Sequence, residues 1–225
     1  MDIWEAMRQR HAVRAFMKCS LPAEAADELR RETEKINRES GLHIQLITDE
    51  AEAFAGGILG YGKIKNCSNY LVLAGPKGRD GEIGYYGEKL ALMAQMRGLR
   101  SCWVALTYRK SKAEGELLSG EKRYVVIALG RGETDGVPHK SRKAEAVSNL
   151  QPGSPDWFRK GVEAALLAPT AMNQQRFYLE QKGEKVRARA GLGPYTKVDL
   201  GIVQYHFEIG SGKGRSVWET AEGKE

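Results

Sequence analysis

The spacing of apolar residues changes along the chain between a helical and an extended period, which predicts helices interspersed with strands. Helical spacing predicts helices over residues 3–9, 22–38, 84–97, 154–168 and 199–209. Alternating or short apolar runs predict strands over residues 43–48, 69–75, 101–106, 123–129, 177–181 and 185–190. The order is mixed, without a strict βαβ repeat, so we expect an α+β fold: a mixed sheet flanked by helices.

Polar and glycine residues mark where several of these elements begin and end. Asp2 followed by Glu5 has the form of a capping box, and Ser20 is placed to cap the second helix. Gly41 is expected to stop that helix. Gly98, followed by the apolar Leu99, suits a left-handed residue at the end of the third helix.

Other segments lack a clear apolar period. Residues 55–62 form a glycine-rich loop, and residues 111–118 are expected to form a polar helix. Residues 130–154, rich in Gly, Pro, Ser, Lys and Arg, predict a long irregular crossover. Lys182-Gly183 predicts the turn of a hairpin, and the polar tail after Lys213 is expected to be mobile.

The composition is that of an ordinary globular protein. The chain has 225 residues, of which 41% are hydrophobic, so it needs no disulfide scaffold. Its three cysteines show no CxxC spacing, which fits a reducing, cytoplasmic location. Its apolar runs are far shorter than the ~20 residues that span a bilayer, and no secretory leader is apparent. We therefore expect no membrane association.

The formal net charge of +6 is less informative than where positive residues lack acidic neighbours. Residues 8–14 and 139–143 each carry three permanent positive charges and no acid. Arg10 and Arg14 could converge on one phosphate, because a guanidinium offers planar, bidentate donors. Taken singly, each stretch is more often a solvated surface. Two such stretches in one compact chain favour a shared phosphate site.

Polar side chains also gather after the fourth predicted helix. Thr170, Asn173, Gln174 and Gln175 lie within six residues and precede a strand. Their amides and hydroxyl could bind a planar heterocycle or a ribityl chain, but plain turn chemistry explains them equally well. The four histidines are too dispersed to predict a metal site.

Together, five segments resemble the nitroreductase family of FMN enzymes. They are Arg10-His11-Ala12-Val13-Arg14-Ala15-Phe16, Tyr86-Gly87-Glu88 with Gly98–Val104, Lys140-Ser141-Arg142, Ala168-Pro169-Thr170-Ala171-Met172-Asn173-Gln174-Gln175, and Asp199–Ile202 with His206-Phe207-Glu208.

Three departures from the family pattern refine this resemblance. Ala12 stands where the family has Ser, so a phosphate contact there would use the backbone N–H, and Arg176 replaces the usual Pro. The segment at 168–175 follows, instead of preceding, the segment at 86–104. This order resembles a single-chain subgroup. It implies a pseudo-dimer of two related halves, residues 1–150 and 151–210, with one FMN between them and a mobile tail at 211–225.

The resemblance also implies the chemistry and the site. NADH or NADPH would give hydride to flavin N5, and a nitroaromatic or quinone-like acceptor would take it. No side chain is required as a catalytic acid. The implied cofactor contacts are Arg10, His11, Ala12, Arg14, Lys140 and Arg142 around the phosphate, the backbone of Trp103, Val104 and Ala105 near N5, Asn69 at the pyrimidine edge, and Thr170, Asn173 and Gln175 at the ring edge or ribityl.

The sequence leaves one alternative function and disfavours another. A flavin-binding or redox-sensing protein could keep the fold with little turnover. A basic nucleic-acid binder is not expected, since no RRM, KH or helix-turn-helix pattern is present. The expected partner is a small-molecule electron acceptor. A monomer is expected, with a homodimer left open.

Overall fold

The computed structural model describes residues 1–55 and 63–219. The chain divides into two compact units, Met1–Pro138 and His139–Glu225, and each is described by itself. The division falls at Pro138 rather than at the predicted residue 150. Residues 139–150 belong with the second unit because they hydrogen-bond to residues later in that unit. Ser148, for example, forms a parallel bridge with Leu179.

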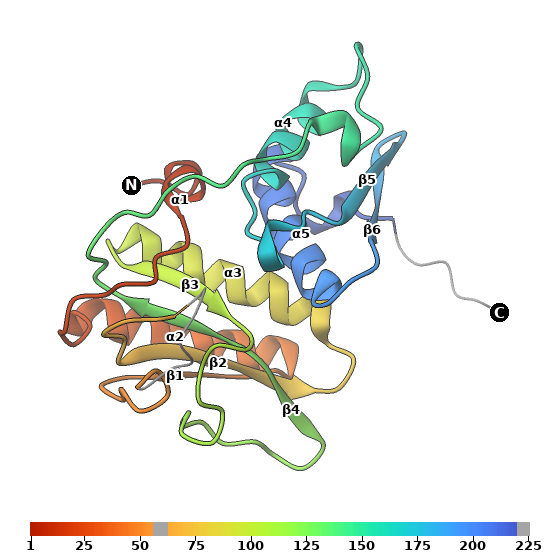
Figure 1. Cartoon of the computed structure of the whole chain (residues 1–225). Helices are drawn as coiled ribbons and strands as arrows, with labels where there is room; N and C mark the ends of the chain where they lie inside the picture. Colours follow the sequence, from red (N-terminus) through yellow and green to blue (C-terminus); the bar gives the residue numbers. More distant parts are fainter. Residues whose placement is uncertain (56–62, 220–225) are drawn as a thin grey trace. The chain divides into compact units, whose positions relative to one another are not determined.

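The first unit is built on a four-stranded sheet with strand order β1-β2-β4-β3, in which every pair is antiparallel (Figure 1). Helices α1, α2 and α3 complete the unit, and α2 and α3 pack against each other and against strands of the sheet. Its elements are α1 (Ile3–Gln9), α2 (Ala23–Ser40), β1 (His43–Ile47), β2 (Asn69–Pro76), α3 (Asp80–Met96), β3 (Arg100–Val104) and β4 (Glu121–Gly130).

Both faces of this sheet are buried, because the central strands β2 and β4 carry apolar side chains on either side. Leu73 and Trp103 lie against Gly87 of α3 on one face. The other face packs against the N-terminal segment and against residues of the segments that follow β1 and β3. Its cluster includes Val13, Phe16, Phe54, Tyr70, Val72, Cys102, Val104, Tyr108, Val126 and Ala128.

The second unit pairs two helices with a hairpin. Helices α4 (Asp156–Ala165) and α5 (Thr196–Ser211) pack together, and the hairpin of β5 (Phe177–Lys182) and β6 (Lys185–Ala190) contacts α5. Short 3₁₀ turns occupy Ala144–Ala146, Ala171–Asn173 and Gly214–Val217. The aromatic rings of Phe158, Phe207, Trp157 and Trp218 form the core, with the Phe207–Trp218 centroids 5.1 Å apart.

Most predicted ends of helices are confirmed. The Glu5 N–H donates to Asp2 Oδ1 at 2.7 Å. Gly41 and Gly98 are left-handed, with φ of 69° and 76°. The predicted cap at Ser20 is wrong, since its hydroxyl donates to Asp49 and Pro22 precedes the helix. Helix α3 begins at Asp80, earlier than residue 84.

The polar helix predicted at 111–118 is wrong. Gly115 has φ of +113°, and the Arg123 guanidinium binds the carbonyls of Lys110, Ala113 and Gly115 at 3.0–3.2 Å. These carbonyls would otherwise accept helical hydrogen bonds. The side chain of Gln45 pairs with both backbone groups of Glu116 at 2.8 Å. Partners distant in sequence therefore hold the segment in a non-helical path.

The tail expected to be mobile from residue 211 is packed as far as Glu219. Helix α5 continues to Ser211, and a 3₁₀ turn follows. The Trp218 indole N–H donates to Glu208 at 2.6 Å, and the Glu219 N–H donates to the Val186 carbonyl at 2.9 Å. The glycine-rich loop predicted at 55–62 lies, apart from Ala55, outside the described residues. Among those described, no helix is both long and apolar enough to cross a membrane.

Candidate active site

The N-terminal basic segment is held in an extended path beside the sheet. Helix α1 ends at Gln9, and the Val13 N–H donates to the Ser101 carbonyl of β3 at 3.0 Å. The Arg14 carbonyl accepts from Lys65 N–H at 2.8 Å. These backbone bonds fix the path of the segment, and the side chains of Ala12 and Arg14 are exposed. Arg14 is therefore placed as a surface cation on a rigid support.

Arg10 differs from Arg14 because it is buried. Its side chain is 2% exposed and lies beside the fully buried Glu88 of α3, with Nε 3.3 Å from Oε1. This contact is an ion pair without hydrogen-bond geometry, because Arg10 Nε has no hydrogen-bond partner. Glu88 Oε2 also accepts a hydrogen bond from the Trp103 indole N–H at 2.9 Å. One buried carboxylate thus joins two of the predicted site residues.

Gly87 makes room for the Trp103 indole. A Cβ at residue 87 would lie 2.5 Å from Trp103 Cη2 and 2.6 Å from Leu73 Cδ1, which is closer than carbon atoms approach. The Gly87-Glu88 pair therefore admits the ring and binds its N–H. Sequence reasoning quoted both residues as part of a motif but gave them no role. The motif was the signal in the sequence, since α3 also carries Asp80, Glu82 and Lys89 and its composition does not single out Glu88.

Trp103, Val104 and the following Ala105 lie at the outer strand of the sheet. Strand β3 pairs with β4 on one side. Its other side contacts the chain through the bridge between Ser101 and Ala12, as far as the described residues extend. The Val104 side chain is buried in the core, so only backbone groups at this edge suit a ligand.

Asn69 lies in the same row across the sheet but not beside these residues. It pairs with Leu129, which pairs with Ser101. Three strand spacings therefore separate it from Ala12, about 14 Å. Its buried amide accepts from Asp49 N–H at 3.1 Å and donates to Ser68. This amide stabilises the left-handed Asp49, whose φ is 58°.

In the second unit, the predicted residues lie together in one hydrogen-bonded cluster. The Gln175 carboxamide donates to the Lys140 carbonyl at 2.9 Å and accepts from Arg142 N–H at 2.8 Å. Asn173 Nδ2 donates to the same Lys140 carbonyl at 2.9 Å. Thr170 Oγ1 accepts from Gln175 N–H at 3.0 Å. The side chains of Lys140 and Arg142 are exposed.

The loop that carries these amides is conformationally unusual. Met172, Asn173 and Gln175 have φ of 52°, 52° and 45°, a region that non-glycine residues seldom adopt. Asp199 of α5 stabilises the loop by two hydrogen bonds. Its carboxylate accepts from Ala171 N–H at 2.9 Å and from Gln174 Nε2 at 2.7 Å. Asp199 was quoted in a motif without a role.

Burial raises the pKa of Asp199 from 3.8 to about 6, although the two hydrogen bonds oppose the shift. Between these values the folded protein binds this proton and the unfolded chain does not. Stability is therefore expected to fall as pH rises from 4 to 6, by up to about 3 kcal/mol, and then to level off. Asp199→Asn should remove this component. Urea denaturation of both proteins at pH 4, 5, 6 and 7 measures it, and parallel stability profiles would contradict the assignment.

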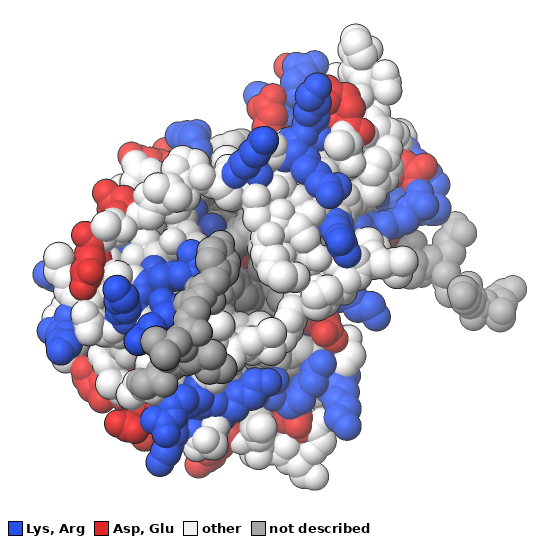
Figure 2. Space-filling model, in the orientation of Figure 1, with Lys and Arg blue, Asp and Glu red and all other residues white. Residues whose placement is uncertain are grey.

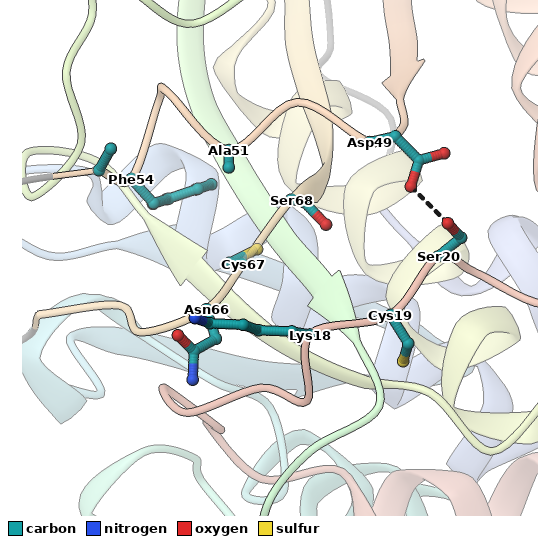
Figure 3. A pocket seen from close by; sticks show the side chains of 10 residues that line it. Lys18, Cys19, Ser20, Asp49, Ala51, Phe54, Asn66, Cys67 and Ser68 are labelled. Carbon is teal, nitrogen blue, oxygen red and sulfur yellow. Dashed lines mark hydrogen bonds between the residues drawn. The ribbon is translucent and has the colours of Figure 1, made fainter.

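Neither of the two described cavities contains a predicted site residue. The larger, about 500 Å³, is lined by Lys18, Cys19, Ser20, Asp49, Phe54 and Cys67 among others (Figure 3). Burial raises the pKa of the Cys67 thiol to about 12, so this thiol stays protonated. The second, about 390 Å³, lies near Arg97–Arg100 and Gly132. No group of three or more His, Cys, Asp or Glu in the described ranges could hold a metal ion.

A profile of a protein family, described as "Putative TM nitroreductase", matches residues 2–211. This chain belongs to that family. Membership in the nitroreductase family supports a general oxidoreductase role. The matched residues belong to both units and include the two basic segments and the loop at 168–175.

Solved structures support the nitroreductase fold. A "putative nitroreductase" from Thermotoga maritima MSB8 matches with a TM-score of 0.66 and 22% identity, over 93% of this chain and 83% of that one. Two proteins named "Putative NADH dehydrogenase/NAD(P)H nitroreductase", from Bacteroides thetaiotaomicron VPI-5482 and Parabacteroides distasonis ATCC 8503, each match with a TM-score of 0.51, over 64% of this chain and 95% of theirs. Their identities are 16% and 18%. No curated protein matches this nitroreductase-family chain.

Proposed function

We propose that this member of the nitroreductase family is an FMN-dependent oxidoreductase that oxidises NADH or NADPH and reduces a nitroaromatic or quinone-like acceptor. The observation that carries the proposal is the buried guanidinium of Arg10, followed four residues later by the exposed Arg14. The NAD(P)H assignment is supported by the names of the two relatives from Bacteroides and Parabacteroides. We propose one FMN per chain, in a cytoplasmic protein.

The residues present fit an anionic cofactor. Arg10 is 3% exposed, and its Nε, 3.3 Å from Glu88 Oε1, has no hydrogen-bond partner among the described residues. A buried donor of this kind is costly unless a partner binds it, and a phosphate matches the planar fork of a guanidinium. Glu88 offsets the charge of Arg10 without accepting a hydrogen bond from this Nε. The neighbouring Arg14 adds a second cation.

The chain's own residues would bind and orient the cofactor. When bound, FMN would supply hydride transfer at its N5 atom. Arg10 and Arg14 would bind its phosphate, and Ala12 and His11 would contribute through the backbone of the same segment. Backbone groups at the open edge of β3, from Trp103 to Ala105, would donate hydrogen bonds to the ring. The participation of Lys140 and Arg142 in phosphate binding stays a sequence-based prediction, tested by the variants below.

Two assays in sequence test the proposal. Reconstitution of the purified chain with FMN should give the yellow absorption bands of a bound flavin, in a ratio of one per chain. Oxidation of NADH or NADPH with a nitroaromatic or quinone acceptor then separates an enzyme from a flavin-binding sensor. A chain that binds no FMN would refute the proposal. One that binds FMN without turnover would favour the sensor.

The basic character of the surface is mixed. On the face drawn in Figure 2, Lys and Arg side chains lie among Asp and Glu side chains. A protein that tracks a nucleic-acid backbone usually carries a continuous basic stripe. For the displayed face, this distribution favours local recognition of a small phosphate over binding of a polyanion.

Arg14→Ala should weaken FMN binding by about 1.5–3 kcal/mol, the value of a hydrogen bond to a charged group. The side chain is exposed, so folding should be unaffected. FMN affinity is measured by quenching of flavin fluorescence on titration with apoprotein. Arg8→Ala is the matched control: Arg8 is an exposed arginine of the same segment, in the last turn of α1. Equal affinities for Arg14→Ala and the wild type would contradict the phosphate assignment.

A further inference from the structure

We propose that Gln175 is a positioning residue: its buried carboxamide fixes the backbone of the basic loop, residues 139–143, so that Lys140 and Arg142 are presented for phosphate binding. The inference rests on the proposed function, because FMN is the phosphate-bearing ligand with which it is tested. It also replaces the sequence-based expectation that Gln175 contacts the flavin directly. All residues of the argument lie in the second unit.

The carboxamide of Gln175 pairs with the basic loop as the N–H and C=O of one residue in a neighbouring parallel strand would. Its Oε1 accepts from Arg142 N–H at 2.8 Å, and its Nε2 donates to the Lys140 carbonyl at 2.9 Å. The second Nε2 hydrogen can reach Asn173 Oδ1, at 2.8 Å. Both residues flanking Ser141 are thereby held by one side chain.

The loop is also held from its other side, by the end of helix α4. Ser141 Oγ donates to the Leu166 carbonyl at 3.0 Å, and His139 Nε2 lies 3.0 Å from the same oxygen. The side chains of residues 139 and 141 are therefore bound to the end of α4. Lys140, Ser141 and Arg142 are all exposed, and only Ser141 of these three has its side chain bound to α4 among the contacts described. Contacts at alternate residues thus decide which side chains of the loop remain available.

Gln175 itself has little freedom and no spare donor hydrogen for a ring edge. Its residue is 2% exposed, its backbone N–H donates to Thr170 Oγ1 at 3.0 Å, and its φ is 45°. A carboxamide has two donor hydrogens and an oxygen with two lone pairs. Protein groups occupy both hydrogens and one of the lone pairs. A side chain used in this way acts on a ligand through the loop that it holds.

A double-mutant comparison tests this indirect action. Gln175→Ala should weaken FMN binding by about tenfold or more in the wild-type background, the loss expected when one charge-assisted contact is misplaced. In a Lys140→Ala/Arg142→Ala background the same change should weaken binding by less than about twofold, because the residues that it positions are absent. The visible spectrum of bound flavin should be unchanged by Gln175→Ala, since the ring loses no contact.

A measurement on apoprotein provides a readout that needs no cofactor. The Arg142 N–H is protected by Gln175 Oε1, so Gln175→Ala should accelerate its hydrogen exchange by about tenfold or more. Gln174→Ala is the matched control. Gln174 binds the Pro194 carbonyl and Asp199 rather than the basic loop, so exchange at Arg142 should stay at the wild-type rate.

Asn173→Gly is a second variant with a milder expected effect on folding. Glycine tolerates the φ of 52° at this position. The change removes one of the two hydrogen bonds to the Lys140 carbonyl and the Oδ1 that accepts from Gln175 Nε2. It should weaken FMN binding by about threefold, a loss again absent in the double-alanine background. Should Gln175→Ala fail to fold, this variant tests the same loop.

The outcomes separate this inference from the proposed function. Equal loss of FMN affinity on Gln175→Ala in both backgrounds, or unchanged exchange at Arg142, would overturn the positioning role while leaving FMN binding intact. Failure of the wild-type chain to bind FMN would overturn the proposed function and this inference with it. Loss of affinity confined to the wild-type background, with faster exchange at Arg142, is the expected result.

Discussion

Glu88→Ala should destabilise the protein by about 3–5 kcal/mol, the cost of breaking a buried ion pair by removing one partner. Glu88 is fully buried, and its carboxylate lies 3.3 Å from Arg10 Nε and accepts the Trp103 indole N–H at 2.9 Å. Alanine would leave the guanidinium of Arg10 buried without its counter-charge, and would leave the indole N–H without this acceptor. Urea denaturation followed by circular dichroism measures the loss.

A matched control lies on the same helix. Glu82 of α3 pairs with Arg79, but its side chain is 42% exposed, so Glu82→Ala should cost less than about 1 kcal/mol. Glu88→Gln should fall between the two, because an amide oxygen can still accept from Trp103 but carries no charge. A cost for Glu88→Ala as small as that for Glu82→Ala would show that the buried pair does not stabilise the unit.

Gly210→Ala is expected to destabilise the second unit by about 3 kcal/mol, at the upper end of the cost of over-packing. Gly210 lies in α5, where alanine would ordinarily stabilise a helix by about 1 kcal/mol. Here a Cβ would lie 2.4 Å from Ala164 Cβ and 2.6 Å from the Lys160 carbonyl oxygen of α4. Neither neighbour is a flexible side-chain end, so the helices must separate. The change in the denaturation midpoint gives the sign and size.

Two further variants make this prediction specific. Glu163→Ala, at an exposed position of α4, should change stability by less than about 0.5 kcal/mol. Ala164→Gly in the Gly210→Ala background removes one of the two obstructing atoms and should restore part of the loss. A stabilising effect of Gly210→Ala would mean that α4 and α5 are not as close as the structure places them.

Much of the fold was predictable because its signals are local. The capping box at Asp2, the left-handed glycines at 41 and 98, and the alternation of β5 and β6 each depend on a few neighbouring residues. The predicted helix at 111–118 failed for the opposite reason. Arg123 binds carbonyls of this segment, and Gln45 binds the backbone of Glu116. Both partners lie outside the segment, so the spacing of its own apolar residues does not reveal them.

For the candidate site too, the sequence identified residues, and the structure showed their contacts and burial. The sequence identified Lys140, Arg142, Asn173 and Gln175 as residues of interest, and the structure brings them together. The flavin contacts predicted for the two amides stay a prediction, and in the structure both carboxamide groups hydrogen-bond to the loop backbone. Equally, Arg10 and Arg14 looked alike as positive charges in one segment, but only Arg10 is buried.

By itself, the sequence determined the nitroreductase family, the α+β class and the two acid-free basic stretches, because these depend on residue type and order. Only the tertiary structure decided which charge is offset by Glu88, which amide holds a loop and where the tail packs. Burial and hydrogen-bond partnership arise between residues far apart in the chain. The free energy of a charge or amide depends on those partners, and a linear pattern does not contain them.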